Sequence, residues 1–224
     1  WSDGSRRDGV SVIKYEVSPE SVTFTWPDSA TLSTFAAADR QVDTPSRRTY
    51  RKGTDAIELE RPFTPVLGVT YERVENFVRE TVSGTLRSNR VTLFFNKVTT
   101  TAANAANLSY TGTAQVAGGK PGSATGALTS PAATLSVTAS DKKIAGTIQI
   151  FESVGGVATL RASLPISATL AASDTFSGTI DDTANGFKGS FGGALAGPNR
   201  EEVVLIFNVA HTDGREYIGS YIGD

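Results

Sequence analysis

Residues 186–202 decide the fold, and they read Gly186-Phe187-Lys188-Gly189-Ser190-Phe191-Gly192-Gly193-Ala194-Leu195-Ala196-Gly197-Pro198-Asn199-Arg200-Glu201-Glu202. Large apolar residues alternate here with small ones, and a period of two indicates a β-strand whose faces meet different surroundings. Glycine at alternate positions lets a strand bend or lets another backbone approach closely. Repeated glycine kinks help a sheet to close into a barrel. The stretch therefore predicts a bent barrel strand followed by a Gly-Pro-Asn turn.

Composition excludes several classes of site. The chain has 224 residues, a net charge of −2, one histidine, no cysteine and no methionine. Disulfides, thiolate metal sites and cysteine nucleophiles are therefore absent, and any histidine-based site must use His211. The small net charge offers no attraction for nucleic acid, and no apolar run is long enough for a membrane-spanning helix. We expect neither a nucleic-acid partner nor a membrane-spanning helix.

Charge divides the chain into two parts. Residues 1–104 contain 27 charged side chains, whereas residues 105–224 contain 17 and are dominated by Gly, Ala, Ser and Thr. The small, polar segment 99–107 has the composition of a linker. We predict two domains, 1–104 and 105–224.

Both parts are predicted to be all-β. The strand-like runs of the second part are Leu108–Val116, Ser123–Thr129, Thr134–Thr138, Ile144–Phe151, Val157–Ala162, Thr175–Ile180, Phe187–Leu195, Val203–Val209 and Glu216–Ile222. Turns are expected between them at 118–122, 140–143, 155–156, 185–186 and 213–214. Eight or nine short antiparallel strands without a sustained helix indicate a sandwich or a closed barrel.

The first part is also rich in predicted strands. They are Val10–Val17, Ser21–Trp26, Ala56–Leu59, Val69–Glu75, Arg79–Arg87 and Arg90–Lys97, with a hairpin turn at Ser88-Asn89. Ser29–Arg40 predicts one short helical turn, which Asp28-Ser29 would cap.

The interior of an eight-stranded barrel is filled by side chains or holds one small ligand. Five large apolar residues are available to fill it, namely Phe187, Phe191, Leu195, Leu205 and Phe207. We predict a plugged barrel, with binding carried by the end loops and by the first part of the chain.

The stretch 186–202 resembles the signature of the C-terminal β-barrel domain of the transferrin-binding protein B family. In that family a glycine/aromatic strand leads into a Gly-Pro-Asn turn, an acidic residue and the next strand. The matching residues are Phe187, Gly189, Phe191, Gly197, Pro198, Asn199, Glu201 and Glu202. Residues 109–114, 135–148 and 176–180 resemble earlier strands of the same domain in the same order. The sequence departs from the family at Arg200, where a small residue is common, and at Val203–Leu205, where glycines are common.

The resemblance covers roughly residues 105–224 and implies an eight-stranded antiparallel barrel there, preceded by a handle-like β domain at 1–104. Family members are typically exported to the outer surface of Gram-negative bacteria as lipoproteins or secreted proteins. They bind transferrin, haem, haemoglobin or complement regulators, often for a TonB-dependent transporter. The absence of methionine at position 1 agrees with export, and the lipid-bearing cysteine of an anchored form would lie upstream of Trp1.

His211 and Tyr217 are the candidate ligand residues. His211 follows a predicted strand beside Asp213-Gly214, so a turn histidine competes with a ligand of haem or a metal. Without cysteine or methionine, haem ligated on both sides would need His211 together with a tyrosine such as Tyr217. Haem is the cofactor that the sequence leaves open, and no metal site is predicted.

Catalytic motifs are not found. Asp181-Asp182 and Glu201-Glu202 are adjacent carboxylates, but neighbours on a strand point to opposite faces, which favours turn solvation over glycoside hydrolysis or Ca²⁺ binding. Glu201 is also placed to cap turn amides. Gly118-Gly119 and Gly192-Gly193 precede no predicted helix, which excludes a phosphate loop, and Ser190 does not resemble a nucleophile elbow. We expect a protein that is not an enzyme.

A cationic segment of the first part supplies the candidate partner-binding residues, which are Arg47, Arg48, Tyr50, Arg51 and Lys52. As an exposed loop or edge strand, they would suit an acidic partner or anionic headgroups. The competing interpretation is an edge strand charged against aggregation. Four aromatic residues are expected to line a ligand cleft or, by preference, to pack in the core: Trp26, Phe63, Tyr71 and Phe77.

The leading functional hypothesis is therefore a surface-exposed binding protein. It would capture a nutrient or host protein as accessory to a TonB-dependent outer-membrane transporter. Two alternatives are direct binding of haem or another small ligand, and a structural or adhesive role at the cell surface.

Overall fold

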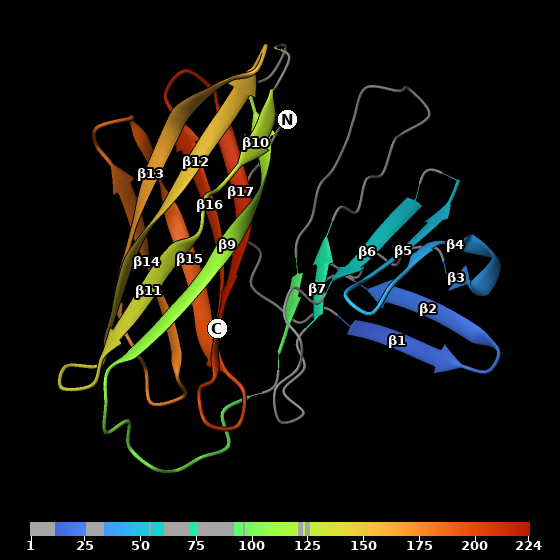
Figure 1. Ribbon diagram of the computed structural model, residues 1–224, viewed down its shortest axis with the longest axis horizontal. Helices are drawn as coiled ribbons and strands as arrows, with labels where there is room; N and C mark the ends of the chain where they lie inside the picture. Colours follow the sequence, from blue (N-terminus) through green and yellow to red (C-terminus); the bar gives the residue numbers. More distant parts are fainter. Residues whose placement is uncertain are drawn as a thin grey trace. The chain divides into compact units, whose positions relative to one another are not determined.

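The computed structural model describes residues 12–25, 34–53, 55–60, 72–75, 92–95, 97–120, 123 and 126–224. The chain divides into two compact units, and the boundary falls between Phe94 and Phe95. The described residues of both units lie mainly in strands (Figure 1). The expected border after residue 104 lies ten residues further along the chain, because the backbone of Lys97, Thr99 and Thr100 is bonded to the second unit.

The first unit contains two small antiparallel sheets. One has the order β1 (Val12–Val17), β2 (Glu20–Thr25), β3 (Phe35–Ala36), and the other has the order β4 (Arg40–Asp43), β5 (Arg47–Lys52), β6 (Asp55–Glu60), β7 (Glu72–Glu75), β8 (Thr92–Phe94). A single 3-10 turn, η1 (Ala37–Asp39), follows β3 and lies within the segment predicted to form a short helical turn. Small sheets of short strands need a buried apolar face to be stable, and here the two sheets share it. Phe35 and Tyr50 provide it, with ring centroids 6.0 Å apart.

Several predicted features lie outside the described residues, and the structure does not bear on them. These are the strand Arg79–Arg87, the turn at Ser88-Asn89, the cap at Asp28-Ser29 and the aromatic residues Trp26, Phe63, Tyr71 and Phe77.

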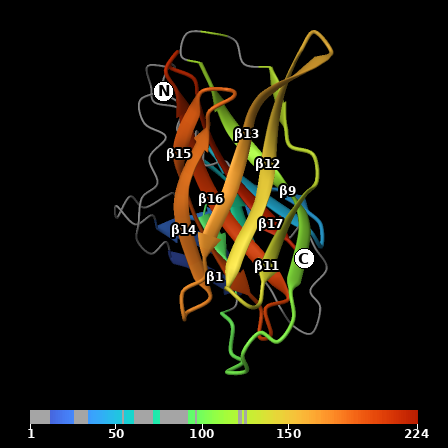
Figure 2. The ribbon, with the colours of Figure 1, turned by 90° about the vertical axis from the view of Figure 1, so that its left-hand side faces the viewer.

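The second unit is an antiparallel β-barrel, as predicted. Its strands are β9 (Leu108–Gly119), β10 (Ala127–Thr129), β11 (Ala133–Thr138), β12 (Lys143–Val154), β13 (Val157–Thr169), β14 (Thr175–Asp182), β15 (Phe187–Ala196), β16 (Glu202–His211) and β17 (Glu216–Gly223). Pairing runs β13-β12-β11-β9-β17-β16-β15-β14. The short β10 pairs with residues 151–153 of β12, and β11 pairs with residues 143–146. Both therefore pair with the same edge of β12 at different points along it, so that β10 and β11 share one of the eight positions around the barrel. Figure 2 shows β11 beside β12.

The barrel closes where β13 meets β14. No ladder pairing joins these two strands within the described chain, and a side chain provides a link instead. The carboxylate of Asp182, at the end of β14, accepts the Ser163 amide at 2.6 Å and the side-chain amide of Asn185 at 2.9 and 3.0 Å. Asp182 is only 4% exposed. The expected solvation of this residue in a turn is therefore wrong, because its carboxylate is used at the seam.

The barrel interior is filled, as predicted. The five residues expected to fill it, Phe187, Phe191, Leu195, Leu205 and Phe207, all belong to one buried cluster. Tyr110, Tyr217 and Tyr221 join that cluster from β9 and β17. Side chains of this size occupy the space that a small ligand would need in an eight-stranded barrel.

Glycines let the strands approach closely at this curvature. A Cβ atom on Gly189 would collide with the Asn208 carbonyl oxygen of β16, so β15 and β16 can pair here only without a side chain. The same applies to Gly118, whose Cβ would meet the Glu216 carbonyl oxygen. The expected turn at 118–122 therefore begins too early, because Gly118 and Gly119 continue β9 and pair with β17.

We expect Gly189→Val to lower the free energy of unfolding by about 1–3 kcal/mol, since the added atoms meet backbone that cannot move aside without breaking the β15–β16 ladder. Lys188→Val is the matched control, because Lys188 lies on the same strand with its side chain exposed. Chemical denaturation of both variants measures the effect. Equal stability of the two variants would contradict the role given to Gly189.

Candidate binding surfaces

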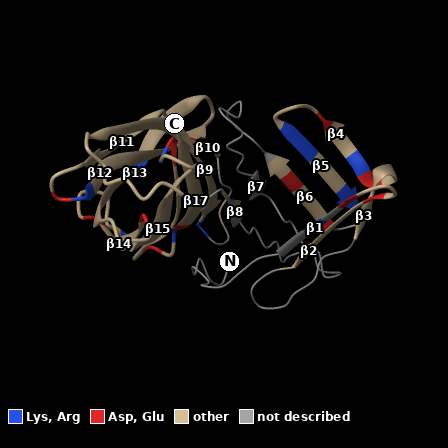
Figure 3. Cartoon of the chain, turned by 90° about the horizontal axis from the view of Figure 1, so that it is seen from below, with Lys and Arg blue, Asp and Glu red and all other residues tan. Residues whose placement is uncertain are grey.

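The predicted partner-binding cations lie on β5, which is an inner strand between β4 and β6. The expectation of a loop or edge strand is therefore wrong. Acidic residues lie on the flanking strands β4 and β6 (Figure 3). Arg47 makes a two-point contact with Glu58 at 2.6 and 2.8 Å, and the Arg48 Nε donates to Asp43 at 2.9 Å. The Lys52 Nζ donates to the Thr34 carbonyl oxygen at 3.0 Å.

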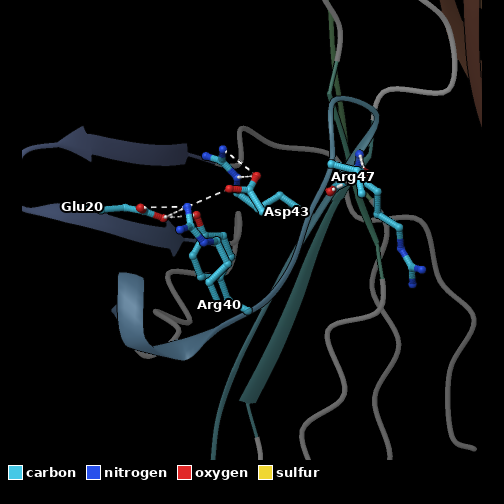
Figure 4. A network of polar contacts seen from close by, with 7 residues as sticks. Glu20, Arg40, Asp43 and Arg47 are labelled. Carbon is cyan, nitrogen blue, oxygen red and sulfur yellow. Dashed lines mark hydrogen bonds and ion pairs between the residues drawn. The ribbon is translucent and has the colours of Figure 1, made fainter.

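A second set of polar contacts joins the two sheets of the first unit. The Tyr50 hydroxyl donates to Glu20 at 2.7 Å, and Arg40 contacts both Glu20 at 3.1 Å and Asp43 at 2.9 Å. In Figure 4, Glu20, Arg40 and Asp43 converge, while Arg47 lies to one side. Tyr50 is 1% exposed, so its ring belongs to the core. Buried tyrosines usually direct the hydroxyl to a partner in this way.

These contacts change what the cationic segment offers to a partner. The charges of Arg47 and Arg48 are paired with carboxylates, and Tyr50 is buried. Lys52 donates a hydrogen bond to a neutral carbonyl oxygen. Arg51 is exposed and has no partner among the residues that the structure describes. Of the five predicted partner-binding residues, Arg51 and Lys52 thus carry positive charge that no carboxylate of the described residues neutralises.

His211 and Tyr217 lie at the same end of the barrel, and both are close to the ring of Phe187. The ring centroid of Phe187 lies 5.1 Å from that of His211 and 5.3 Å from that of Tyr217. The His211 Nδ1 accepts the Asp213 amide at 3.0 Å, and a Cβ atom on Gly186 would lie 2.7 Å from Nε2. His211 is thus partly buried and ends β16, next to the turn that leads to β17. Tyr217 is 1% exposed, and burial raises the pKa of its hydroxyl.

A haem titration tests the alternative in which this pair coordinates haem. We expect haem to produce no shift of the Soret band on addition to the protein, because Tyr217 lies in the barrel core and both nitrogens of His211 face protein atoms. His211→Ala is the control and should behave as the wild type does. A Soret shift that is lost in His211→Ala would establish the haem-binding alternative.

The residues of the family signature form a structural junction. Gly197 has φ +83° and begins the turn between β15 and β16. The Pro198 carbonyl oxygen accepts the amides of Thr99 and Thr100 at 3.1 and 2.9 Å. Glu201 accepts both the backbone amide and the side-chain amide of Asn199, at 2.8 and 2.9 Å, which confirms that it caps turn amides.

Arg200, where the sequence departs from the family, is built into the same junction. It adopts φ +67°, which is uncommon for a residue with a side chain. Its Nε donates to Asp174 at 2.9 Å and its Nη1 donates to the Ala102 carbonyl oxygen at 3.2 Å. Its own carbonyl oxygen accepts the Tyr110 hydroxyl at 2.7 Å. The arginine therefore connects the turn, the β13–β14 loop, the segment before β9 and β9 itself.

Glu201 and Glu202 have opposite electrostatic environments. Burial disfavours ionisation of Glu201, but its bonds from Asn199 outweigh burial and lower its pKa. Glu202 is 5% exposed, and its Oε2 has no partner among the described residues. Burial, reinforced by Asp224 and Glu201, raises the pKa of Glu202 to about 7.

We expect Glu202→Gln to be more stable than the wild type at pH 8. A carboxylate whose pKa is raised from 4.5 to about 7 on folding favours the folded state when protonated, so ionisation above pH 7 costs at most about 3 kcal/mol. The advantage of the variant should shrink as the pH falls from 7 toward 4.5. Urea denaturation at several pH values measures it.

Glu201→Gln is the matched control for this experiment. The pKa of Glu201 is lowered, so its ionised form stabilises the fold above its ordinary pKa, and the variant should lose stability at pH 8. Two variants that change stability in the same direction at pH 8 would contradict the assignment.

A polar cluster that the sequence did not reveal lies at the end of the barrel near His211. Glu152 of β12 accepts the Gly126 amide at 2.9 Å and the Arg161 Nε at 2.7 Å, and it is buried. The hydrogen bond from the Gly126 amide is the main cause that lowers the pKa of Glu152. Burial acts in the opposite direction, and the ion pair with Arg161 lowers the pKa further. Arg161 is the extra residue of a bulge between β12 and β13. Sequence alone could not find this pair, because the bulge places Arg161 beside a residue nine positions earlier.

The described residues contain no group of three or more acidic, histidine or cysteine side chains arranged to hold a metal ion. In the same part of the chain, no helix has the length and apolar character needed to cross a bilayer.

The fold defines a class of protein: a unit of small sheets followed by a closed, filled barrel. No family model matches the chain, and no curated protein matches its sequence. The matches are solved structures, and they show that the chain has the transferrin-binding protein B fold.

Three of these structures illustrate the likeness. Isotype 1 transferrin-binding protein B from serogroup B Neisseria meningitidis aligns with 92% of this chain and 49% of its own, with a TM-score of 0.52 and 12% identity. The intact Ap-TbpB, with its N and C lobes, aligns with 99% of this chain and 47% of its own, with a TM-score of 0.53 and 11% identity. A surface lipoprotein aligns with 96% of this chain and 97% of its own, with a TM-score of 0.51 and 12% identity. The chain thus spans about half the length of the first two proteins.

Proposed function

We propose that this chain is a non-enzymatic binding protein on the surface of a Gram-negative bacterium. It captures a nutrient or host protein and serves as accessory to a TonB-dependent outer-membrane transporter. A lipid anchor upstream of Trp1 would hold it at the outer membrane.

The filled barrel carries this proposal. Phe187, Phe191 and Phe207 occupy the interior together with the buried tyrosines, so a ligand has to meet the outer surface or the end loops. Rigid barrels commonly present binding loops in this way. Likeness to structures named for binding transferrin supports a protein partner rather than a small substrate.

The junction around Arg200 supports the same mode of action. It fixes the segment before β9 to the β15–β16 turn through backbone and side-chain bonds. Surfaces held in one arrangement lose little conformational entropy on binding, which favours recognition without rearrangement. The protein therefore acts by displaying its surfaces, with no bond chemistry.

Affinity capture from native outer membranes tests the proposal. With the full chain as bait, we expect recovery of an integral outer-membrane transporter or of a host protein added to the membranes. An Arg51→Glu bait should recover less of a partner that contacts the first unit. Because Arg51 is exposed and unpaired within the described chain, the Arg51→Glu variant should have the same free energy of unfolding as the wild type.

Recovery of copies of this chain alone would overturn the proposal and favour the structural or adhesive alternative. Equal recovery by the wild-type and Arg51→Glu baits would place the contact away from β5 while leaving the proposed function intact.

A further inference from the structure

The β12–β13 hairpin projects from one end of the barrel (Figure 2). Its strands are 12 and 13 residues long. Gly155 and Gly156 connect them with φ +58° and +83°, and two residues with positive φ are typical of the tight turn that suits the twist of a hairpin.

The tip of this hairpin has a strand edge that no described residue pairs with. The Ser163 amide bonds to Asp182, the last residue of β14, so β13 from Val157 to Ala162 extends beyond the end of β14. In the described chain β13 pairs with β12 alone. The side chains from Val157 to Leu160 are all exposed.

The register identifies the backbone groups on that edge. Val154 and Val157 are paired across the two-residue turn, and such a closing pair exchanges both of its backbone hydrogen bonds. Hydrogen-bonded and non-hydrogen-bonded pairs then alternate, so Ala158 and Leu160 direct N–H and C=O away from β12. These are the groups that an added strand would meet.

The edge also lacks the usual protection against pairing. Natural edge strands carry charges or proline that prevent association. Residues 153–160 contain neither. Instead, Val154, Val157 and Leu160 are 59%, 68% and 37% exposed.

The base of the hairpin is held rigidly. The Glu152 carboxylate joins the Gly126 amide to Arg161, and β10 pairs with residues 151–153 of β12. The tip is thus the end of a three-stranded sheet, β10-β12-β13. A preformed edge of this kind reduces the entropy that a binding partner must offset.

We propose that the free edge of β13, from Val157 to Arg161, is a docking site for an extended, uncharged segment of a protein partner. The segment adds a strand to the sheet through the backbone of Ala158 and Leu160, and it packs apolar side chains against Val157 and Leu160. This inference rests on the proposed function, because it specifies how the protein partner binds.

A second copy of the chain fits this edge less well. Five residues of strand are on the order of 17 Å long. Pairing through that length alone falls far short of the roughly 1,000 Å² that a stable interface between folded proteins needs. A flexible segment of a larger partner avoids this limit, since the partner can make its other contacts elsewhere.

A displayed library of seven-residue peptides, selected on the full chain, provides defined probes. We expect enrichment of uncharged peptides rich in β-branched and aromatic residues. Synthetic copies should slow amide hydrogen exchange at Ala158 and Leu160. Ala158→Pro should weaken their binding at least tenfold, because it removes an edge N–H while sparing the ladder to β12.

Ala158→Thr is the matched control, since it keeps the N–H group and should bind within about twofold of the wild type. Leu160→Lys is a second variant that leaves the backbone intact and places a charge at the edge, and it should also weaken binding. Thermal unfolding confirms that each variant is folded.

The inference is overturned if no peptide is enriched, if peptides bind Ala158→Pro and Leu160→Lys as they bind the wild type, or if protection from exchange lies elsewhere. A dimer in sedimentation that disappears in Ala158→Pro would also overturn it, by making a second copy the occupant. Capture of an outer-membrane partner at wild-type levels by Leu160→Lys would overturn the inference and leave the proposed function standing. If wild-type bait captures no partner while peptides protect Ala158, the proposed function fails and the edge remains a docking site.

Discussion

Closure of the barrel is the constraint on which the second unit depends. Eight strands can curve into a closed sheet only if backbones approach closely at certain points, and Gly118 and Gly189 occupy two of them. At the last junction the ladder is replaced by the Asp182 carboxylate, which accepts the Ser163 amide. The closed sheet then encloses a volume that aromatic side chains fill, which leaves the outer surface and the end loops for the proposed binding of a partner. Architecture and mode of action follow from the same requirement.

The junction around residues 197–201 shows how a departure from a family pattern is accommodated. A small residue with positive φ would satisfy the turn at lower conformational cost than Arg200. The arginine offsets that cost with bonds to Asp174 and to the Ala102 carbonyl oxygen. It therefore fastens the segment before β9 to the barrel, a task that a small residue could not perform. Arg200 thus bonds the turn to further segments of the chain, while the backbone of the turn keeps its shape.

Sequence periodicity was sufficient for the barrel strands and for the filling of the interior, because alternation and turn residues are local signals. Periodicity failed for residues whose burial and partners depend on contacts between distant segments of the chain. The cations of β5 indicate exposure to solvent and therefore a loop or an edge strand. In the structure β5 is an inner strand, and Glu58 and Asp43 on the neighbouring strands pair with Arg47 and Arg48. Asp182 was assigned to solvent because a turn follows it, although its carboxylate bonds to a strand 19 positions earlier. Neither the partners nor the burial of such groups is encoded in the local pattern.

The two candidate surfaces differ in the physical basis of recognition. On β5, Arg47 and Arg48 are already paired with carboxylates of the first unit, so attraction of an acidic partner depends chiefly on Arg51 and Lys52 and weakens with salt. At the tip of β13, residues 157–160 carry no charge and Arg161 is paired with Glu152. Recognition there depends on backbone hydrogen bonds and apolar contact, which salt hardly screens. Backbone pairing is tolerant of side-chain identity, so the β13 edge accepts many sequences of the right shape. Specificity must then come from what surrounds the edge, and the turn with His211 and Asp213 lies at that same end of the barrel, with Lys120 3.8 Å from Asp213.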